Sequence, residues 1–308
     1  MSFATTRPLR RALQIALLWT LVEAPSARAT ILVLVPAGEP SAVLESIAAG
    51  VRETTDDIEV RPVESDGTIS AREGVGADHD AVIVLGRTLL DGSDIATGDV
   101  PVLLGGFTGA PENRRGLPYI SLNVDPAYVV EQIEKTGPPI VRIQSVLPPD
   151  AIAAPEVSTL VSLKEIATKA IAFANGERAT ARAWFDVLES ADGAGDVLWI
   201  LDDRYLDASG TYRYLTERAW RRDLLVISTI PSYARRGVAV GFVPDLAAYG
   251  ALLVRSAQRM IDDPEYVPDP LLGAGTVQRV FNRRTLEHVG RRLPSDLDRT
   301  GRIDIVIE

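Results

Sequence analysis

The sequence contains no cysteine and only two histidines among its 308 residues. The lack of cysteine excludes disulfides, a thiol nucleophile and a lipid-anchored cysteine, so hydrophobic cores must hold the fold. The two histidines, His79 and His288, are far apart in the sequence, and His79 lies between two aspartates. One histidine with neighbouring acids lacks the spacing of a metal site and indicates a solvated turn. We therefore expect no metal and no cofactor.

Long hydrophobic runs are also missing. The N-terminal run, residues 12–22, is about half of the roughly 20 residues that a membrane-spanning helix needs. It follows the basic residues Arg7, Arg10 and Arg11, and it precedes Ala27-Arg28-Ala29, which has small residues at the positions that a signal peptidase reads. This layout predicts a secretory signal at residues 1–29 and a soluble periplasmic protein without a lipid anchor. The alternative is an amphipathic N-terminal helix.

Positive charge is scarce in the rest of the chain. Without the signal segment, the chain has 28 basic and 41 acidic residues, which gives a net charge of −13. Such an acidic chain repels nucleic acid and anionic membrane surfaces, so we exclude both as partners.

Strand and helix patterns alternate through the first part of the chain. A helix pattern begins at Ser41, with apolar residues on one face. Continuous apolar, β-branched runs are typical of strands that are buried on both faces. Such runs occupy residues 30–35, 58–63, 81–85, 101–104 and 119–122. The alternation predicts a parallel, doubly wound sheet.

A second series of the same kind follows a break between Asp125 and Pro139. Strand patterns lie at residues 140–146, 170–173, 197–201 and 224–227, with helix patterns at 156–167, 179–188 and 209–220. One large domain is the alternative, but two series of similar size favour two lobes that share a hinge. We expect the first lobe at residues 30–122 and the second at 126–243.

No catalytic set stands out in the sequence. It contains no nucleophile-elbow serine, and its glycine-rich segments do not precede helix N-termini that could bind a phosphate. Asp202 and Asp203 end a strand, where carboxylates can bind a metal or transfer protons, but a helix-capping loop around Ser209 is the better interpretation. The sequence therefore predicts a protein that is not an enzyme.

Loops at strand ends are the places where open parallel sheets bind ligands. In this chain they lie at residues 36–41, 86–88, 105–108, 148–152 and 202–209. Two facing lobes would direct all of these loops into one cleft.

Several segments in the last hundred residues resemble one known family, and a glycine-arginine-threonine step after the third strand fits the same pattern. They are residues 86–88, 197–203, 230–237, 242–250, 281–290 and 303–306, which read GRT, VLWILDD, IPSYARRG, FVPDLAAYG, FNRRTLEHVG and IDIV. In their order and spacing they resemble the substrate-binding components of ABC transporters, which have the type I periplasmic-binding-protein fold, in the branch that includes aromatic amino-acid binders. Residues 146–196 match that family poorly.

The resemblance implies two Rossmann-like lobes, with residues 245–275 returning to the first lobe and part of 276–308 belonging to the second. It implies a periplasmic, monomeric protein that captures a small ligand, an amino acid or a similar molecule, between its lobes for an ABC permease. One alternative is a ligand sensor or accessory binding protein without its own transporter. The other is an exported α/β enzyme that uses Asp203 and Asp245 as an acid-base pair.

The candidate ligand-binding residues follow from these loops and motifs. They are Ser41, Gly86, Thr88, Phe107, Asp203, Tyr233 and Asp245. Glycine lets a backbone approach a ligand, and the Thr88 hydroxyl suits a carboxylate or an amine. A carboxylate can pair with a ligand ammonium, and the Tyr233 ring can cover an apolar group. The alternative for Asp245 is an ordinary helix N-cap.

Overall fold

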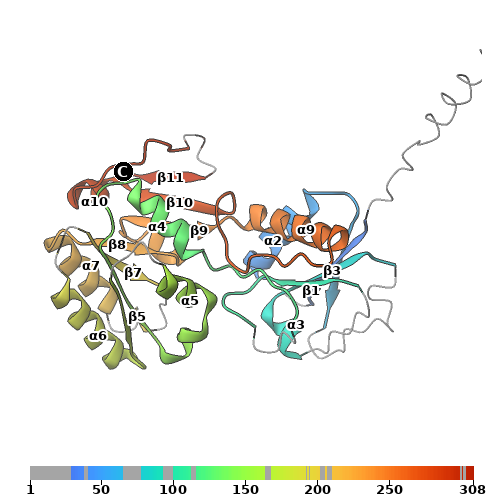
Figure 1. Ribbon diagram of the computed structural model, residues 1–308, viewed down its shortest axis with the longest axis horizontal. Helices are drawn as coiled ribbons and strands as arrows, with labels where there is room; N and C mark the ends of the chain where they lie inside the picture. Colours follow the sequence, from blue (N-terminus) through green and yellow to red (C-terminus); the bar gives the residue numbers. More distant parts are fainter. Residues whose placement is uncertain are drawn as a thin grey trace, which may run out of the picture.

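Two α/β lobes lie side by side in this computed structural model (Figure 1). The structure describes residues 29–37, 41–64, 78–92, 100–111, 116–163, 168–191, 193, 195–201, 205–206, 210–298, 300 and 303–308. The predicted signal segment, except for Ala29, lies outside these residues. None of the helices described is both long and apolar enough to cross a membrane.

The first lobe is built on a four-stranded parallel sheet. Its strand order is β2 (Ile58–Val63), β1 (Ile31–Pro36), β3 (Ala81–Leu85) and β4 (Val102–Gly105). All five residues of β3 are buried, as expected for a strand that is covered on both faces. The lobe's helices are α2 (Ala42–Arg52), α3 (Arg87–Gly92) and α9 (Leu246–Asp262).

Helix α9 comes late in the sequence but packs against α2, β3 and β4. Two glycines allow the two helices to come this close. A Cβ at Gly50 would lie 2.1 Å from the carbonyl oxygen of Ala247, and one at Gly250 would lie 2.3 Å from the carbonyl oxygen of Ile47. The small residues therefore determine where α9 docks.

The second lobe is built on a seven-stranded sheet with helices around it. The strand order is β11 (Asp304–Ile307), β10 (Val277–Asn282), β9 (Val240–Pro244), β8 (Leu225–Ser228), β7 (Asp196–Ile200), β5 (Arg142–Leu147) and β6 (Thr168–Phe173). The helices are α4 (Pro126–Glu134), the 3-10 turn η2 (Pro149–Ala153), α5 (Pro155–Ser162), α6 (Glu177–Ser190), α7 (Thr211–Arg221), α8 (Pro231–Ala234) and α10 (Arg283–His288). The predicted fold class, two Rossmann-like lobes, is confirmed.

Two segments depart from the regular parallel pattern. Strand β10 runs antiparallel to β9, because the chain leaves the second lobe at the end of β9 and re-enters it at the same side. The strand expected at residues 119–122 is reduced to a single bridge between Leu104 and Tyr119. Beyond that bridge, the Ser121 amide bonds to the Pro270 carbonyl instead of continuing along β4.

Three chain segments connect the lobes, and hydrogen bonds tie them together. The first crossover (residues 119–125) runs beside the third (263–276): the Leu272 amide donates to the Asn123 carbonyl, and the Asp125 amide to the Leu272 carbonyl, both at 2.8 Å. In the second crossover, where β9 passes into α9, the Asp245 amide donates to the Thr276 carbonyl at 2.9 Å. We call these three crossovers the hinge. Any change in the angle between the lobes must bend them.

Candidate functional site

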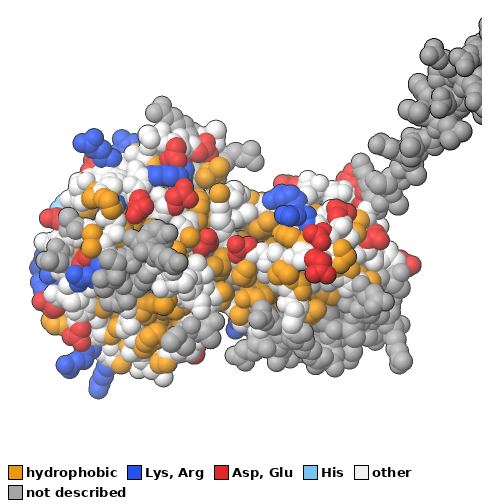
Figure 2. Space-filling view, in the orientation of Figure 1, with side chains coloured by type: hydrophobic (Ala, Val, Ile, Leu, Met, Phe, Trp, Pro, Cys, Tyr) orange, Lys and Arg blue, Asp and Glu red, His pale blue; other side chains and the backbone are white. Residues whose placement is uncertain are grey.

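The carboxyl ends of the strands in the two lobes face each other across the hinge. Strand β9 runs directly into the second crossover, and β5, β7 and β8 share its direction, so their ends point toward the first lobe. In the first lobe, the Gly86 amide bonds to the Gly105 carbonyl, which joins the ends of β3 and β4. The space-filling outline is notched where the lobes meet (Figure 2). This is the arrangement in which open α/β sheets bind ligands.

Three predicted site residues lie at the strand ends of the first lobe. Ser41 is the exposed N-cap of α2, where its hydroxyl accepts a hydrogen bond from the Leu44 amide at 3.3 Å. Thr88 is exposed in the first turn of α3. Gly86 is buried with a φ of +89°, a backbone conformation that side chains rarely adopt. The backbone conformation at position 86 therefore requires a glycine by itself.

Phe107 is buried at the end of β4, with its ring 6.2 Å from that of Tyr119. Its carbonyl accepts a hydrogen bond from the Leu122 amide of the first crossover at 2.8 Å. Phe107 thus joins the strand end to the hinge by packing and by a backbone bond.

Tyr249 also holds this strand end, although the sequence analysis did not single it out as a site residue. Its hydroxyl donates to the Ile120 carbonyl at 2.6 Å and accepts from the Gly106 amide at 2.8 Å. Burial raises the pKa of Tyr249, so the hydroxyl stays protonated and keeps donating. The contacts span 129 and 143 residues of sequence, so no local pattern could have revealed them.

Tyr233 lies in the core of the second lobe. Its side chain is fully buried, its ring is 4.5 Å from that of Tyr212, and the Arg236 guanidinium lies over both rings. In this conformation, the Tyr233 ring is packed inside the second lobe.

Asp245 is the N-cap of α9, and one carboxylate oxygen, Oδ1, accepts from the amides of Ala247 and Ala248 at 3.1 and 3.0 Å. Asp245 therefore caps α9, which is the alternative that the sequence analysis gave for this residue. Asp203, the other predicted carboxylate, lies outside the described residues.

The hinge side of the second lobe contains carboxylates that the sequence analysis did not propose as site residues. Asp125 caps α4, and burial, together with the charge of Asp269 on the third crossover, raises its pKa. Glu156, in the first turn of α5, also has a raised pKa because of burial, although hydrogen bonds from its own backbone amide and from Asn123 oppose the shift. Within the described residues, no group of histidine and acidic side chains is suited to a metal ion.

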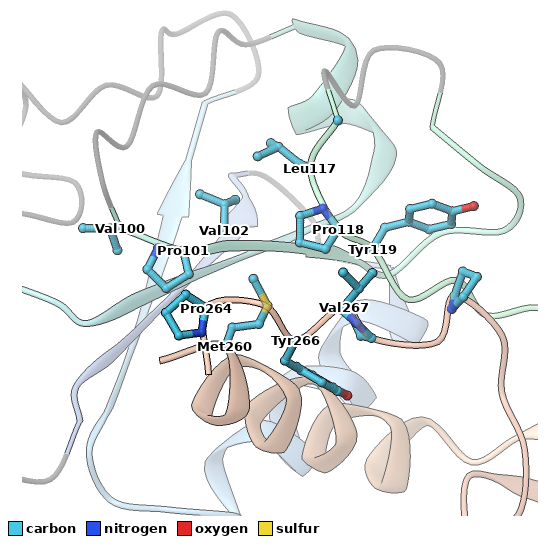
Figure 3. A pocket seen from close by; sticks show the side chains of 13 residues that line it. Val100, Pro101, Val102, Leu117, Pro118, Tyr119, Met260, Pro264, Tyr266 and Val267 are labelled. Carbon is cyan, nitrogen blue, oxygen red and sulfur yellow. The ribbon is translucent and has the colours of Figure 1, made fainter. Parts of the chain in front are cut away.

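An apolar pocket of about 480 Å³ lies at the other end of the first lobe (Figure 3). It is formed where β4 begins and α9 ends, by residues that include Val102, Pro118, Met260 and Val267. A second cavity of about 290 Å³ runs along the third crossover and is lined by residues that include Arg255 and Asp269. The first pocket lies where β4 begins, away from the facing strand ends. The third crossover lines both cavities, with Pro264 and Val267 in the first and Leu271 and Thr276 in the second.

The sequence matches no protein-family model and no curated protein. The fold, however, is that of known solute-binding proteins. An ABC domain in complex with L-Trp from Streptococcus pneumonia is 17% identical, with a TM-score of 0.51 over 91% of this chain and 99% of that one. The open, ligand-free structure of a substrate-binding protein with adhesive properties from Clostridium difficile is 13% identical, with a TM-score of 0.57 and the same coverage. At these identities the likeness establishes the fold.

Proposed function

We propose that this protein is an exported solute-binding protein that captures a small ligand between its two lobes for an ABC-type uptake system. One observation carries the proposal: the carboxyl ends of two separate sheets face each other across three hydrogen-bonded crossovers. A ligand bound there would contact both lobes. It would therefore favour one hinge angle over others, as expected for a two-state binder.

The ligand class is an amino acid or a similar small molecule. The likeness to an L-Trp complex supports this class, and so do the exposed hydroxyls of Ser41 and Thr88 at the strand ends. The protein acts without catalysis, as a monomer, and a permease receives its ligand.

A thermal-shift screen over amino acids, sugars and small carboxylates tests the binding function. A ligand present at 100 times its dissociation constant should stabilise the protein by about 2.7 kcal/mol. For a domain of this size that corresponds to a rise in Tm of roughly 5–10 °C. If a ligand were instead consumed during incubation, the protein would be an enzyme and the proposal would be wrong.

Thr88→Val tests the location of the site. The substitution keeps the shape of an exposed side chain and removes its hydroxyl, so ligand affinity should fall about tenfold with Tm within about 1–2 °C of wild type. Titration calorimetry with the best ligand of the screen measures the change. A large loss of Tm with unchanged affinity would make Thr88 a structural residue.

Export is tested by N-terminal sequencing of the protein recovered from the periplasm. We expect Thr30 as the first residue, because Ala27 and Ala29 are the small residues that the peptidase requires. A product that keeps Met1 in the cytoplasm would contradict both the location and the permease partner.

A further inference from the structure

Helix α5 lies on the side of the second lobe that faces the first (Figure 1). It follows β5 through the short turn η2, so it begins near the carboxyl end of a strand that points toward the hinge. Glu156 is the second residue of this helix. A ligand held between the lobes would therefore meet the first turn of α5.

The Glu156 carboxylate touches the hinge itself. The side chain of Asn123, in the first crossover, hydrogen-bonds to it, as does the backbone amide of Glu156. The backbone of Asn123 is held in turn, because its carbonyl accepts a hydrogen bond from the Leu272 amide of the third crossover. Glu156 thus connects the second lobe to the segments that bend when the lobes move.

One oxygen of this carboxylate has no protein partner. Oε2 is shielded from solvent and accepts no hydrogen bond, and among the residues that the structure describes no basic side chain forms an ion pair with Glu156. The buried carboxylate of Asp304, by contrast, receives two hydrogen bonds from Arg279 at 2.5 and 2.7 Å. A shielded carboxylate without a cation is unfavourable unless something else supplies the charge.

We infer that Glu156 is the anionic recognition group of the interlobe site and that it selects ligands carrying a positively charged nitrogen. This inference rests on the proposed solute-binding function and names its substrate class. An ammonium or guanidinium group would supply both the missing hydrogen bond and the opposite charge. The net charge of −13 without the signal segment acts in the same direction, because an anionic protein attracts cationic solutes.

The experiment compares matched ligands on wild-type protein and on Glu156→Gln. The probes are L-phenylalanine and L-leucine, their deaminated counterparts 3-phenylpropanoate and 4-methylpentanoate, and the amines phenethylamine, putrescine and spermidine, each titrated by thermal shift and calorimetry. Glu287→Gln is the control, because Glu287 is an exposed carboxylate on α10, at the end of the second lobe away from the hinge.

We expect binding among the probes with a charged nitrogen, and a loss of at least tenfold in their affinity in Glu156→Gln. The control should leave affinity unchanged. Without ligand, Glu156→Gln should melt at the wild-type temperature or above it, because the amide removes a shielded charge. Glu156→Asp retains the charge, so the preference for amines should persist at lower affinity.

Three results would overturn the inference. The first is a deaminated counterpart that binds as tightly as its amine. The second is an affinity of Glu156→Gln within twofold of wild type, and the third is a loss of the preference in Glu156→Asp as complete as in Glu156→Gln. In each of these cases a ligand still binds, so the proposed function stands. If no probe of this panel and no compound of the wider screen stabilises the protein, both the inference and the proposed function fail.

Discussion

Replacing Tyr249 by phenylalanine removes one oxygen atom that joins three separate parts of the first lobe. The hydroxyl belongs to α9, donates to the Ile120 carbonyl at the start of the first crossover, and accepts from the Gly106 amide after β4. The ring is fully buried and stays in place in the variant, so no large cavity forms. The cost therefore comes from the two backbone groups that lose their partner.

The size of this effect follows from the burial of those groups. An unsatisfied buried donor or acceptor costs about 1–3 kcal/mol, so two such groups should cost about 3 kcal/mol after local relaxation. For a domain of this size, the expected loss in Tm is roughly 6–12 °C. Urea unfolding followed by far-UV circular dichroism measures the change in the free energy of unfolding, because that signal reports on both lobes.

Tyr266→Phe is the matched control for this measurement. Tyr266 is only half-buried, and its ring lies under the Arg259 guanidinium at 4.1 Å, a contact that phenylalanine preserves. We expect its change in unfolding free energy to stay below about 0.5 kcal/mol. If Tyr249→Phe were equally mild, the hydroxyl would not hold the strand end, and the reasoning would be refuted.

Three further substitutions test the packing of the two lobes. Gly50→Ala forces a Cβ to within 2.1 Å of the Ala247 carbonyl oxygen, so the α2–α9 contact must open, at a cost of about 3 kcal/mol in urea unfolding; a Tm close to wild type would contradict this helix contact. Arg279→Met leaves the buried Asp304 carboxylate without its cation, and the free energy of unfolding should fall by about 3–5 kcal/mol, whereas a change below 1 kcal/mol would mean that the pair is not buried in solution. Asp245→Ala removes the N-cap of α9 and should cost about 1 kcal/mol, and Asp245→Asn should restore most of it; if ligand affinity falls in the asparagine variant while stability returns, the carboxylate also contacts the ligand.

The sequence by itself determined the strands that are buried on both faces. Residues 81–85 were predicted as a strand and are β3, and the run at 197–201 differs from β7 by one residue at each end. These predictions succeed because a strand covered on both sides must be apolar throughout. The sequence of the strand alone shows that property. The alternation of such runs with helix patterns was enough to predict two α/β lobes.

The site depended on partners that are far apart in the sequence. Tyr233 is predicted to cover a ligand, and the structure adds a packing partner for its ring, because α7 and α8 bring it against Tyr212 inside the second lobe. Glu156 is an ordinary first-turn glutamate in the sequence, and the role that we infer for it depends on Asn123, which the hinge brings against it. A periodic pattern tells which face of an element is buried but not which element covers it, so only the tertiary structure decided these contacts.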